Sequence, residues 1–176
     1  MRSLGQILLV ICAMTIFSTV QLSVNASIIQ SFVVSVDSEA SLDAISLGQT
    51  MIDEVAKKSY DEVTIDERIY DRTALTPVFS FGPDSGEVVS IPEGEPYSAN
   101  SVFDDVDDYS GYSRVVQTPR LGEFVISCNV YYLNEANQDQ ISGSQTWYKE
   151  IVVTVTNSHL AEPVNVKTLT VYRRFF

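Results

Sequence analysis

The first part of the chain is marked by a long apolar run. Residues 7 to 24, ILLVICAMTIFSTVQLSV, contain no charged side chain in 18 consecutive positions. A helix needs about 17 to 25 mostly apolar residues to cross the hydrocarbon core of a bilayer. The run therefore predicts a single transmembrane helix.

The helical pattern continues beyond this run. No proline or glycine occurs between Gln6 and Leu47, and apolar side chains recur every three or four positions, as on one face of a helix. We expect the helix to end near Lys57 and Lys58, because positive charge stabilises a helix C-terminus. The recurring apolar positions are Ile29, Val33, Val36, Ala40, Ala44, Leu47, Met51 and Val55.

Together the two patterns predict one helix of about 50 residues, or ~75 Å at 1.5 Å per residue. We assign residues 6–26 to a transmembrane or filament-core helix and residues 27–60 to its amphipathic continuation. Because this length far exceeds that of an average globular helix, the first half must be buried in something other than a small domain. A membrane and the core of a filament are the candidates.

The pattern changes after the helix. Residues 61–122 are rich in proline, glycine and aspartate, which predicts a loop-rich connector with one or two short strands in residues 76–101. Residues 123–176 alternate between apolar and polar side chains and predict an antiparallel β-sheet. Three strands alone are marginal, so we expect the amphipathic helix to cover one face, which makes the fold class α+β. The three strand segments are GEFVISCNVYYL, TWYKEIVVTVTN and VNVKTLTVYRR.

The charge of the chain is negative and unevenly distributed. Its 11 basic and 23 acidic side chains give a formal net charge of -12, so a phosphate backbone would be repelled and no nucleic acid is expected as a partner. No charged side chain lies between Arg2 and Asp37. Because positive charge favours the cytoplasmic end of a membrane helix, we expect a single-pass protein whose acidic C-terminal domain lies outside the cytoplasm.

Three stretches, in chain order, resemble the type IV pilin and pseudopilin family. MRSLGQILLV, residues 1–10, looks like a short prepilin leader followed by an apolar mature N-terminus. SLGQTMIDEVAKKSYDE, residues 46–62, and FDDVDDYSGY, residues 103–112, are similar to the helix end and an acidic segment of MSHA-type (MshD-like) minor pilins. The resemblance implies a pilin-like fold, in which a long N-terminal helix packs on a C-terminal antiparallel sheet.

The resemblance also implies a processing and assembly route. A prepilin peptidase would remove a leader of residues 1–5 by cutting between Gly5 and Gln6, and the new N-terminus would be methylated. The helix would be stored in the inner membrane and then pack against other pilin or pseudopilin subunits in an extracellular filament. The expected function is therefore structural, that of a minor pilin or pseudopilin subunit of a type IV pilus-like filament.

One position departs from the family pattern. Pilins usually carry a glutamate where this chain has Val10, and the resemblance implies that this carboxylate neutralises the terminal amine of a neighbouring subunit. An unpaired charge is costly in an apolar core. Because a tip subunit has no neighbour ahead of it, Val10 predicts a tip or initiating subunit.

The alternative function is that of a membrane-tethered or secreted binding protein whose acidic β-rich domain captures a ligand. A secreted form would arise from a signal sequence cut after Ala26. Against a signal sequence, only Arg2 is basic before the apolar run, and the helical pattern continues through the cut. A continuous helix over residues 7–58 favours the filament subunit, since a tether would tolerate a break near residues 25–31.

Four carboxylates in five residues form the one candidate metal site. Asp104, Asp105, Asp107 and Asp108 offer the oxygen ligands that calcium prefers. The spacing does not match an EF-hand loop, because Val116 stands where the final glutamate would be. Both a calcium site and a solvated acidic loop are therefore open, and the solvated loop is the first expectation.

The remaining candidate chemistry is weak. His159, the single histidine, follows Ser158 in a predicted turn, and adjacent side chains rarely face each other usefully. The sequence has no nucleophile-elbow or HExxH pattern, so we expect no enzyme and no cofactor apart from calcium. Cys12 and Cys128 lie in separate elements, which predicts no disulfide and no thiolate metal site. Aromatic side chains alternate along the strands as core residues do, and residues 172–176 are the stretch considered for contact with another subunit.

Overall fold

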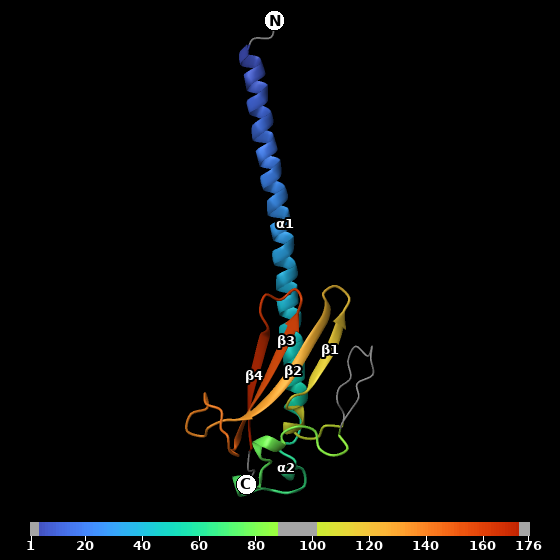
Figure 1. The fold of residues 1–176 in the computed structure, drawn as a ribbon, viewed down its shortest axis with the longest axis vertical. Helices are drawn as coiled ribbons and strands as arrows, with labels where there is room; N and C mark the ends of the chain where they lie inside the picture. The colour runs from blue at the N-terminus through green and yellow to red at the C-terminus, as the bar shows by residue number, and fades with distance from the viewer. Residues whose placement is uncertain (1–3, 88–101, 173–176) are drawn as a thin grey trace. The chain divides into compact units, whose positions relative to one another are not determined.

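The computed structural model describes residues 4–87 and 102–172 (Figure 1). The chain divides into two compact units, residues 1–39 and residues 40–176. One helix, α1 (Leu4–Val55), contributes to both. The first unit holds the apolar half of this helix, and the second holds its remainder, the connector and the sheet.

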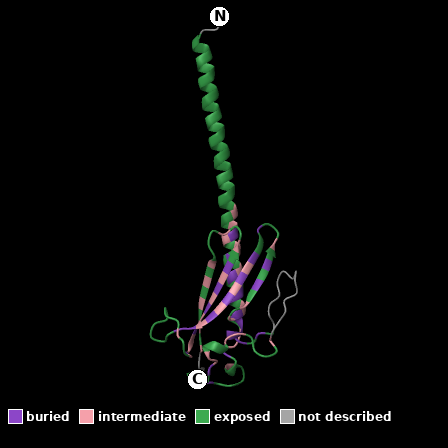
Figure 2. Cartoon of the chain, viewed as in Figure 1, coloured by how far each residue is buried: buried purple, intermediate pink, exposed green. Residues whose placement is uncertain are grey.

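The first unit is helical, and its side chains are exposed. Every residue from Leu4 to Ser35 is exposed (Figure 2). The Thr15 hydroxyl donates a hydrogen bond to the Cys12 carbonyl at 2.9 Å, so this polar group is satisfied within the helix. Within residues 4–87 and 102–172, α1 is the one helix long and apolar enough to cross a membrane, a test that a signal sequence near the N-terminus also passes.

The second unit begins with the amphipathic end of α1. A Cβ atom added to Gly48 would lie 2.8 Å from Cγ2 of Val166, which shows how closely the helix lies on the sheet. The predicted α+β arrangement, a long N-terminal helix packed on a C-terminal antiparallel sheet, is confirmed. The buried positions of the helix recur every three or four residues: Ala40, Ala44, Gly48, Met51, Ile52 and Val55.

The helix ends at Val55 and not near Lys57 and Lys58 as predicted. The amides of these two lysines bond to carbonyls only three residues back, in a tighter turn. The Ser59 amide then donates to the carbonyl of Asp104 at 3.0 Å. Pairing with a segment far along the chain therefore replaces the last turn of the predicted helix.

The sheet has four antiparallel strands in the order β1-β2-β3-β4. The sequence pattern predicts the last three strands, and β1 lies in residues 61–122, the loop-rich connector in which short strands were expected but not at these positions. β1 is short, one of its inward positions is the buried Arg114, and the apolar Val115 is exposed, so its inward face is not recognisable from hydrophobicity alone. The strands are β1 (Ser113–Thr118), β2 (Gly122–Tyr132), β3 (Tyr148–Asn157) and β4 (Val164–Val171).

The buried face of β2 and β3 is almost entirely apolar. The exception is Lys149, which is fully buried on β3. Cys128 on β2 and Cys12 in α1 are both free, so the expectation of no disulfide between them is confirmed. The apolar members of this face are Phe124, Ile126, Cys128, Val130, Tyr132, Ile151, Val153 and Val155.

Apart from β1, the described parts of the connector consist of turns and short helices. A short helix, α2 (Val63–Asp66), and three 3₁₀ turns, η1 (Arg72–Ala74), η2 (Val78–Ser80) and η3 (Asp107–Tyr109), follow α1. In residues 76–87, where a short strand was expected, the chain forms η2 instead. The remainder of that expected strand region, residues 88–101, lies outside the described residues.

Candidate functional site

A buried lysine is the centre of the candidate site. Lys149 lies on the inward face of β3, and its side chain has no exposed surface. Its ammonium donates hydrogen bonds to the Asp61 carboxylate at 2.9 Å, the Asp107 carboxylate at 2.5 Å and the Tyr60 carbonyl at 2.7 Å. Burying a charge is costly unless it is paired and hydrogen-bonded. These three acceptors supply that compensation.

Asp61 is surrounded by hydrogen-bond donors. It follows the turn at the end of α1, and its side chain is fully buried. The Thr76 amide donates to both of its carboxylate oxygens at 3.1 Å, and the Thr76 hydroxyl donates to one of them at 3.1 Å. The Tyr132 hydroxyl donates to the oxygen that also accepts from Lys149, at 3.1 Å. We call these five residues, Lys149, Asp61, Asp107, Thr76 and Tyr132, the Lys149 cluster.

Aromatic rings line the space around the ammonium. The Lys149 Nζ atom lies 4.6 Å from the ring centroid of Tyr60 and 5.2 Å from those of Phe81 and Tyr132. Burial, with the nearby Asp61 charge, raises the pKa of both tyrosines, so their hydroxyls stay protonated. The cluster is therefore enclosed by neutral rings, where electrostatic interactions are stronger than in water.

The predicted acidic loop is largely buried. The expectation of a solvated loop is wrong for Asp105, Asp107 and Asp108, which are only 1 to 3% exposed, whereas Asp104 is exposed. The Asp108 carboxylate accepts from the amides of Asp104 and Asp105, and the Asp105 carboxylate accepts from the Asp108 amide. The segment folds inward because these bonds close it on itself while Asp107 pairs with Lys149.

Burial changes the acidity of this segment. Loss of hydration, reinforced by the charges of Asp107 and Asp108, raises the pKa of Asp105 to about 9. Burial also raises the pKa of Asp107, opposed by the Lys149 ammonium, and raises the pKa of Asp108 to about 7. At neutral pH Asp105 therefore carries a proton, and a side-chain hydrogen bond links it to Asp107.

The structure separates the four predicted metal ligands. Asp104 and Asp108 come together with Glu87, and the carboxylate oxygens of the three lie within 4.8 Å of one another. Asp105 and Asp107 are not in this group, because they take part in the hydrogen bonds described above. Three clustered carboxylates can hold a hard cation, so calcium stays a prediction that rests on this group.

A second buried ion pair joins α1 to β1. The Arg114 guanidinium lies 2.8 Å from the Glu54 carboxylate, and the Tyr109 hydroxyl donates to the same carboxylate at 3.1 Å. Arg114 is 4% exposed. Sequence reasoning singled out none of these residues as partners, since they are 55 or more positions apart. The pair fastens the edge strand to the helix.

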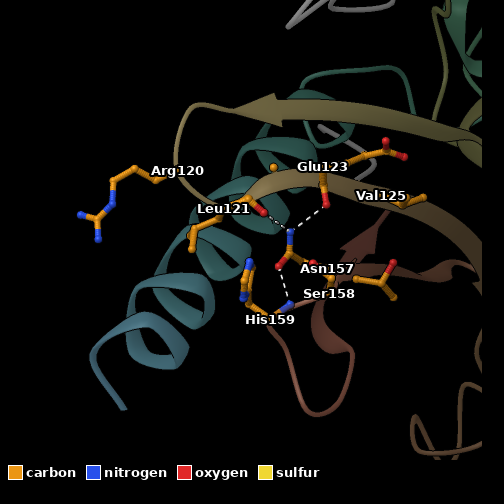
Figure 3. Close-up of a pocket in the computed structure, with 9 residues that line it drawn as sticks. Arg120, Leu121, Glu123, Val125, Asn157, Ser158 and His159 are labelled. Carbon is orange, nitrogen blue, oxygen red and sulfur yellow. Dashed lines mark hydrogen bonds between the residues drawn. The ribbon is translucent and has the colours of Figure 1, made fainter. Parts of the chain in front are cut away.

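The predicted loop histidine lines a shallow hollow of about 460 Å³ between the β1–β2 and β3–β4 turns. The Asn157 side chain spans it by donating to the carbonyls of Leu121 and Glu123 and accepting from the His159 amide (Figure 3). Figure 3 shows Arg120 and Glu123 pointing in opposite directions. The Asn157 side chain therefore links the two turns across this hollow.

The residues assigned to processing and assembly lie in the first turns of α1. Gly5, Gln6 and Val10 are all exposed, and their roles stay predictions. At the other end of the chain, Tyr172 stacks on Trp147 with ring centroids 5.4 Å apart, so it packs within the domain. The rest of the stretch considered for a subunit contact, residues 173–176, lies outside the described residues.

Comparisons with known proteins add no family to this picture. No protein-family model, no curated protein and no solved structure matches the chain. The interpretation of the site therefore rests on its own geometry.

Proposed function

We propose that this chain is a minor pilin or pseudopilin subunit of a type IV pilus-like filament. The observation that carries the proposal is α1 itself. It is one helix from Leu4 to Val55, exposed and apolar at its start and packed on the sheet at its end. The proposed function is assembly, with no catalytic step.

The exposed apolar surface surrounds the helix. Residues 7 to 11, Ile-Leu-Leu-Val-Ile, are all apolar and all at least 50% exposed, and five consecutive positions cover more than one turn of about 3.6 residues. A small soluble partner would cover only one stripe of such a helix. A bilayer or a bundle of similar helices covers all sides, which are the two environments a pilin helix occupies in turn.

The continuity of α1 supports a filament subunit over a tethered binding protein. Residues 25–31, where a tether would tolerate a break, are helical throughout. A filament subunit needs this continuity, because the same helix must enter the filament core and carry the outer domain. A tether gains nothing from it.

Val10, which stands where the family usually has a glutamate, supports a tip or initiating position for the proposed subunit. In this proposal the leader is cut between Gly5 and Gln6, the helix waits in the inner membrane, and the domain that begins at Ala40 lies outside the cytoplasm. The partners are other pilin or pseudopilin subunits, contacted through α1.

The test is mass spectrometry of the mature N-terminus in membrane and sheared-surface fractions of the native cells. A chain that starts at Gln6, is methylated and occurs in sheared filaments is the expected result. A start at Ser27 would make the protein a secreted one, and an intact Met1 confined to the membrane would make it a bitopic anchor. Either outcome contradicts the proposal.

The position within the filament needs a separate measurement. Tagged protein is expected at filament ends, and an even distribution along the shaft would contradict the tip assignment. The matched variants are Val10→Glu and Ile11→Glu, which add the same charge at neighbouring positions. Only Val10→Glu is expected to move the subunit into the shaft.

A further inference from the structure

The Lys149 cluster holds an amine and a carboxyl group in contact, sheltered from water. The Lys149 Nζ atom is 2.9 Å from an oxygen of Asp61, and both side chains are fully buried. A second carboxylate, Asp107, lies 2.5 Å from the same nitrogen. From this geometry we propose that Lys149 and Asp61 condense to an intramolecular amide, with Asp107 transferring the proton.

The condensation balances without any co-reactant. The ammonium of Lys149 gives one proton to Asp107, and the freed amine attacks the carboxyl carbon of Asp61. A nitrogen–carbon bond forms, one carbon–oxygen bond of Asp61 breaks, and the departing oxygen takes the proton held by Asp107 and the second proton lost by the nitrogen. The products are one amide and one water, and nothing is oxidised or reduced.

The hydrogen bonds identify Asp61 as the acyl group. Attack on its carbon moves negative charge onto a carboxyl oxygen, and preorganised donors stabilise such an oxyanion. The Thr76 amide and hydroxyl and the Tyr132 hydroxyl already point at the oxygens of Asp61. Asp107 instead accepts a hydrogen bond from the ammonium and is linked by a side-chain hydrogen bond to Asp105. That position suits proton transfer.

Burial favours the reaction in two ways. Fixing two reacting groups against each other corresponds to effective concentrations of up to ~10⁵ to 10⁸ M in well-oriented systems, which offsets the unfavourable condensation of a free amine with a free acid. The product also removes two opposite charges from a site where each is costly to desolvate. The aromatic wall of Tyr60, Phe81 and Tyr132 keeps out the water that would reverse the step.

The amide would join parts of the chain that are 88 residues apart. It would fasten the turn after α1 to the central strand β3 and enclose the connector and β2 in a covalent loop. Such a link constrains the unfolded chain, as a disulfide does. The inference does not depend on the filament proposal.

The test is the intact mass of the full-length wild-type protein in detergent, followed by peptide mapping after proteolysis. The expected mass is that of the sequence minus one water, with a cross-linked peptide pair that contains Asp61 and Lys149. An unchanged mass, both in fresh protein and after long incubation at neutral pH, would overturn the proposal. A water lost within a single peptide would overturn it as well, since a cyclised aspartate gives the same mass.

Three variants assign the roles. Lys149→Arg keeps the cation but removes the nucleophile, because a guanidinium stays protonated, so the full sequence mass is expected. Asp61→Asn should lose ammonia in place of water, which marks Asp61 as the acyl group. Asp107→Asn should form the link much more slowly or not at all, while circular dichroism shows the wild-type fold. Loss of ammonia from Asp107→Asn would show that Asp107 is the acyl group and would overturn the assignment of Asp61.

Discussion

The two units of this chain depart in opposite ways from the usual pattern of buried apolar and exposed charged side chains. From Leu4 to Ser35 apolar side chains are exposed on a helix that nothing described in the chain covers. In the unit that begins at Ala40, charged side chains are buried, and Lys149 with Asp61 and Asp107 is the extreme case. Exposed apolar side chains need a surface that covers them, and buried charged side chains need oppositely charged neighbours.

The difference lies in where that partner must come from. An apolar surface in water is stabilised only by something outside the chain, here a bilayer or other helices. A buried charge is stabilised by a group inside the chain, and Lys149 has two. The first unit is therefore the part of the chain on which the proposed assembly depends, and the second indicates what holds its domain together.

The largest expected effect comes from removing the buried charge. Lys149→Met leaves Asp61 and Asp107 buried without the ammonium, and breaking a buried ion pair in this way costs about 3 to 5 kcal/mol of unfolding free energy relative to the protein without the amide. Where the amide has formed in the wild type, the loss of the covalent loop adds to this difference. The measurement is urea unfolding of the full-length protein in detergent, followed by circular dichroism.

The matched control removes a lysine from an exposed ion pair. Lys167, with a side chain 57% exposed, lies 3.4 Å from Glu150, and such pairs contribute about 0 to 1 kcal/mol. Lys167→Met is therefore expected to unfold almost as the wild type does. Equal losses in the two variants would show that the burial of Lys149 has no special energetic weight.

The next largest effect concerns the exposed apolar side chains of the first unit. Ile16 lies in the apolar run and is 64% exposed. An aspartate near the centre of a membrane helix costs about 2.5 to 3.5 kcal/mol of insertion free energy, so Ile16→Asp should shift protein from the alkali-resistant membrane fraction to the soluble one. Ile16→Ala is the control and should stay in the membrane. A membrane fraction unchanged by the aspartate would contradict a transmembrane or filament-core role for this run.

The sequence predicts the first unit better than the second, and the reason is the range of the interactions. The helical period and the charge-free run are local, so α1 is predicted up to its last turn. That turn fails because Ser59 bonds to Asp104, which is distant in the sequence. Strands β2, β3 and β4 follow from their alternation, whereas β1 is hidden because Arg114 occupies an inward position.

The Lys149 cluster illustrates the same limit for the site. Lys149 has the same parity along β3 as Ile151 and Val153, which is the one local signal that it faces the core. Its partners Asp61 and Asp107 lie 88 and 42 residues away, so no spacing rule connects them. The aspartate-rich segment is recognisable as a motif, but whether it is solvated or buried depends on that long-range pairing.

The last predicted effect, the smallest when expressed per pH unit, concerns the protonated carboxyl group beside the cluster. Burial raises the pKa of Asp105 to about 9 in the folded protein from its ordinary value of 3.8. Between these values the folded state binds more protons than the unfolded state, so the free energy of unfolding falls as pH rises. One such group contributes a slope of at most ~1.4 kcal/mol per pH unit.

Asp105→Asn isolates this contribution, because an amide has the shape of the protonated acid and donates in the same place. Its carbonyl oxygen can still accept from the Asp108 amide, as the carboxyl oxygen does at 3.1 Å. We expect the variant to match the wild type most closely near pH 4, close to the ordinary pKa of the carboxyl group, and to be more stable near pH 8, by an amount that grows with pH. Denaturant titrations at both pH values measure the difference. The control is Asp139→Asn, which makes the same substitution at an exposed loop residue. A variant less stable than the wild type at pH 8 would mean that Asp105 is ionised in the folded protein, which would contradict its raised pKa.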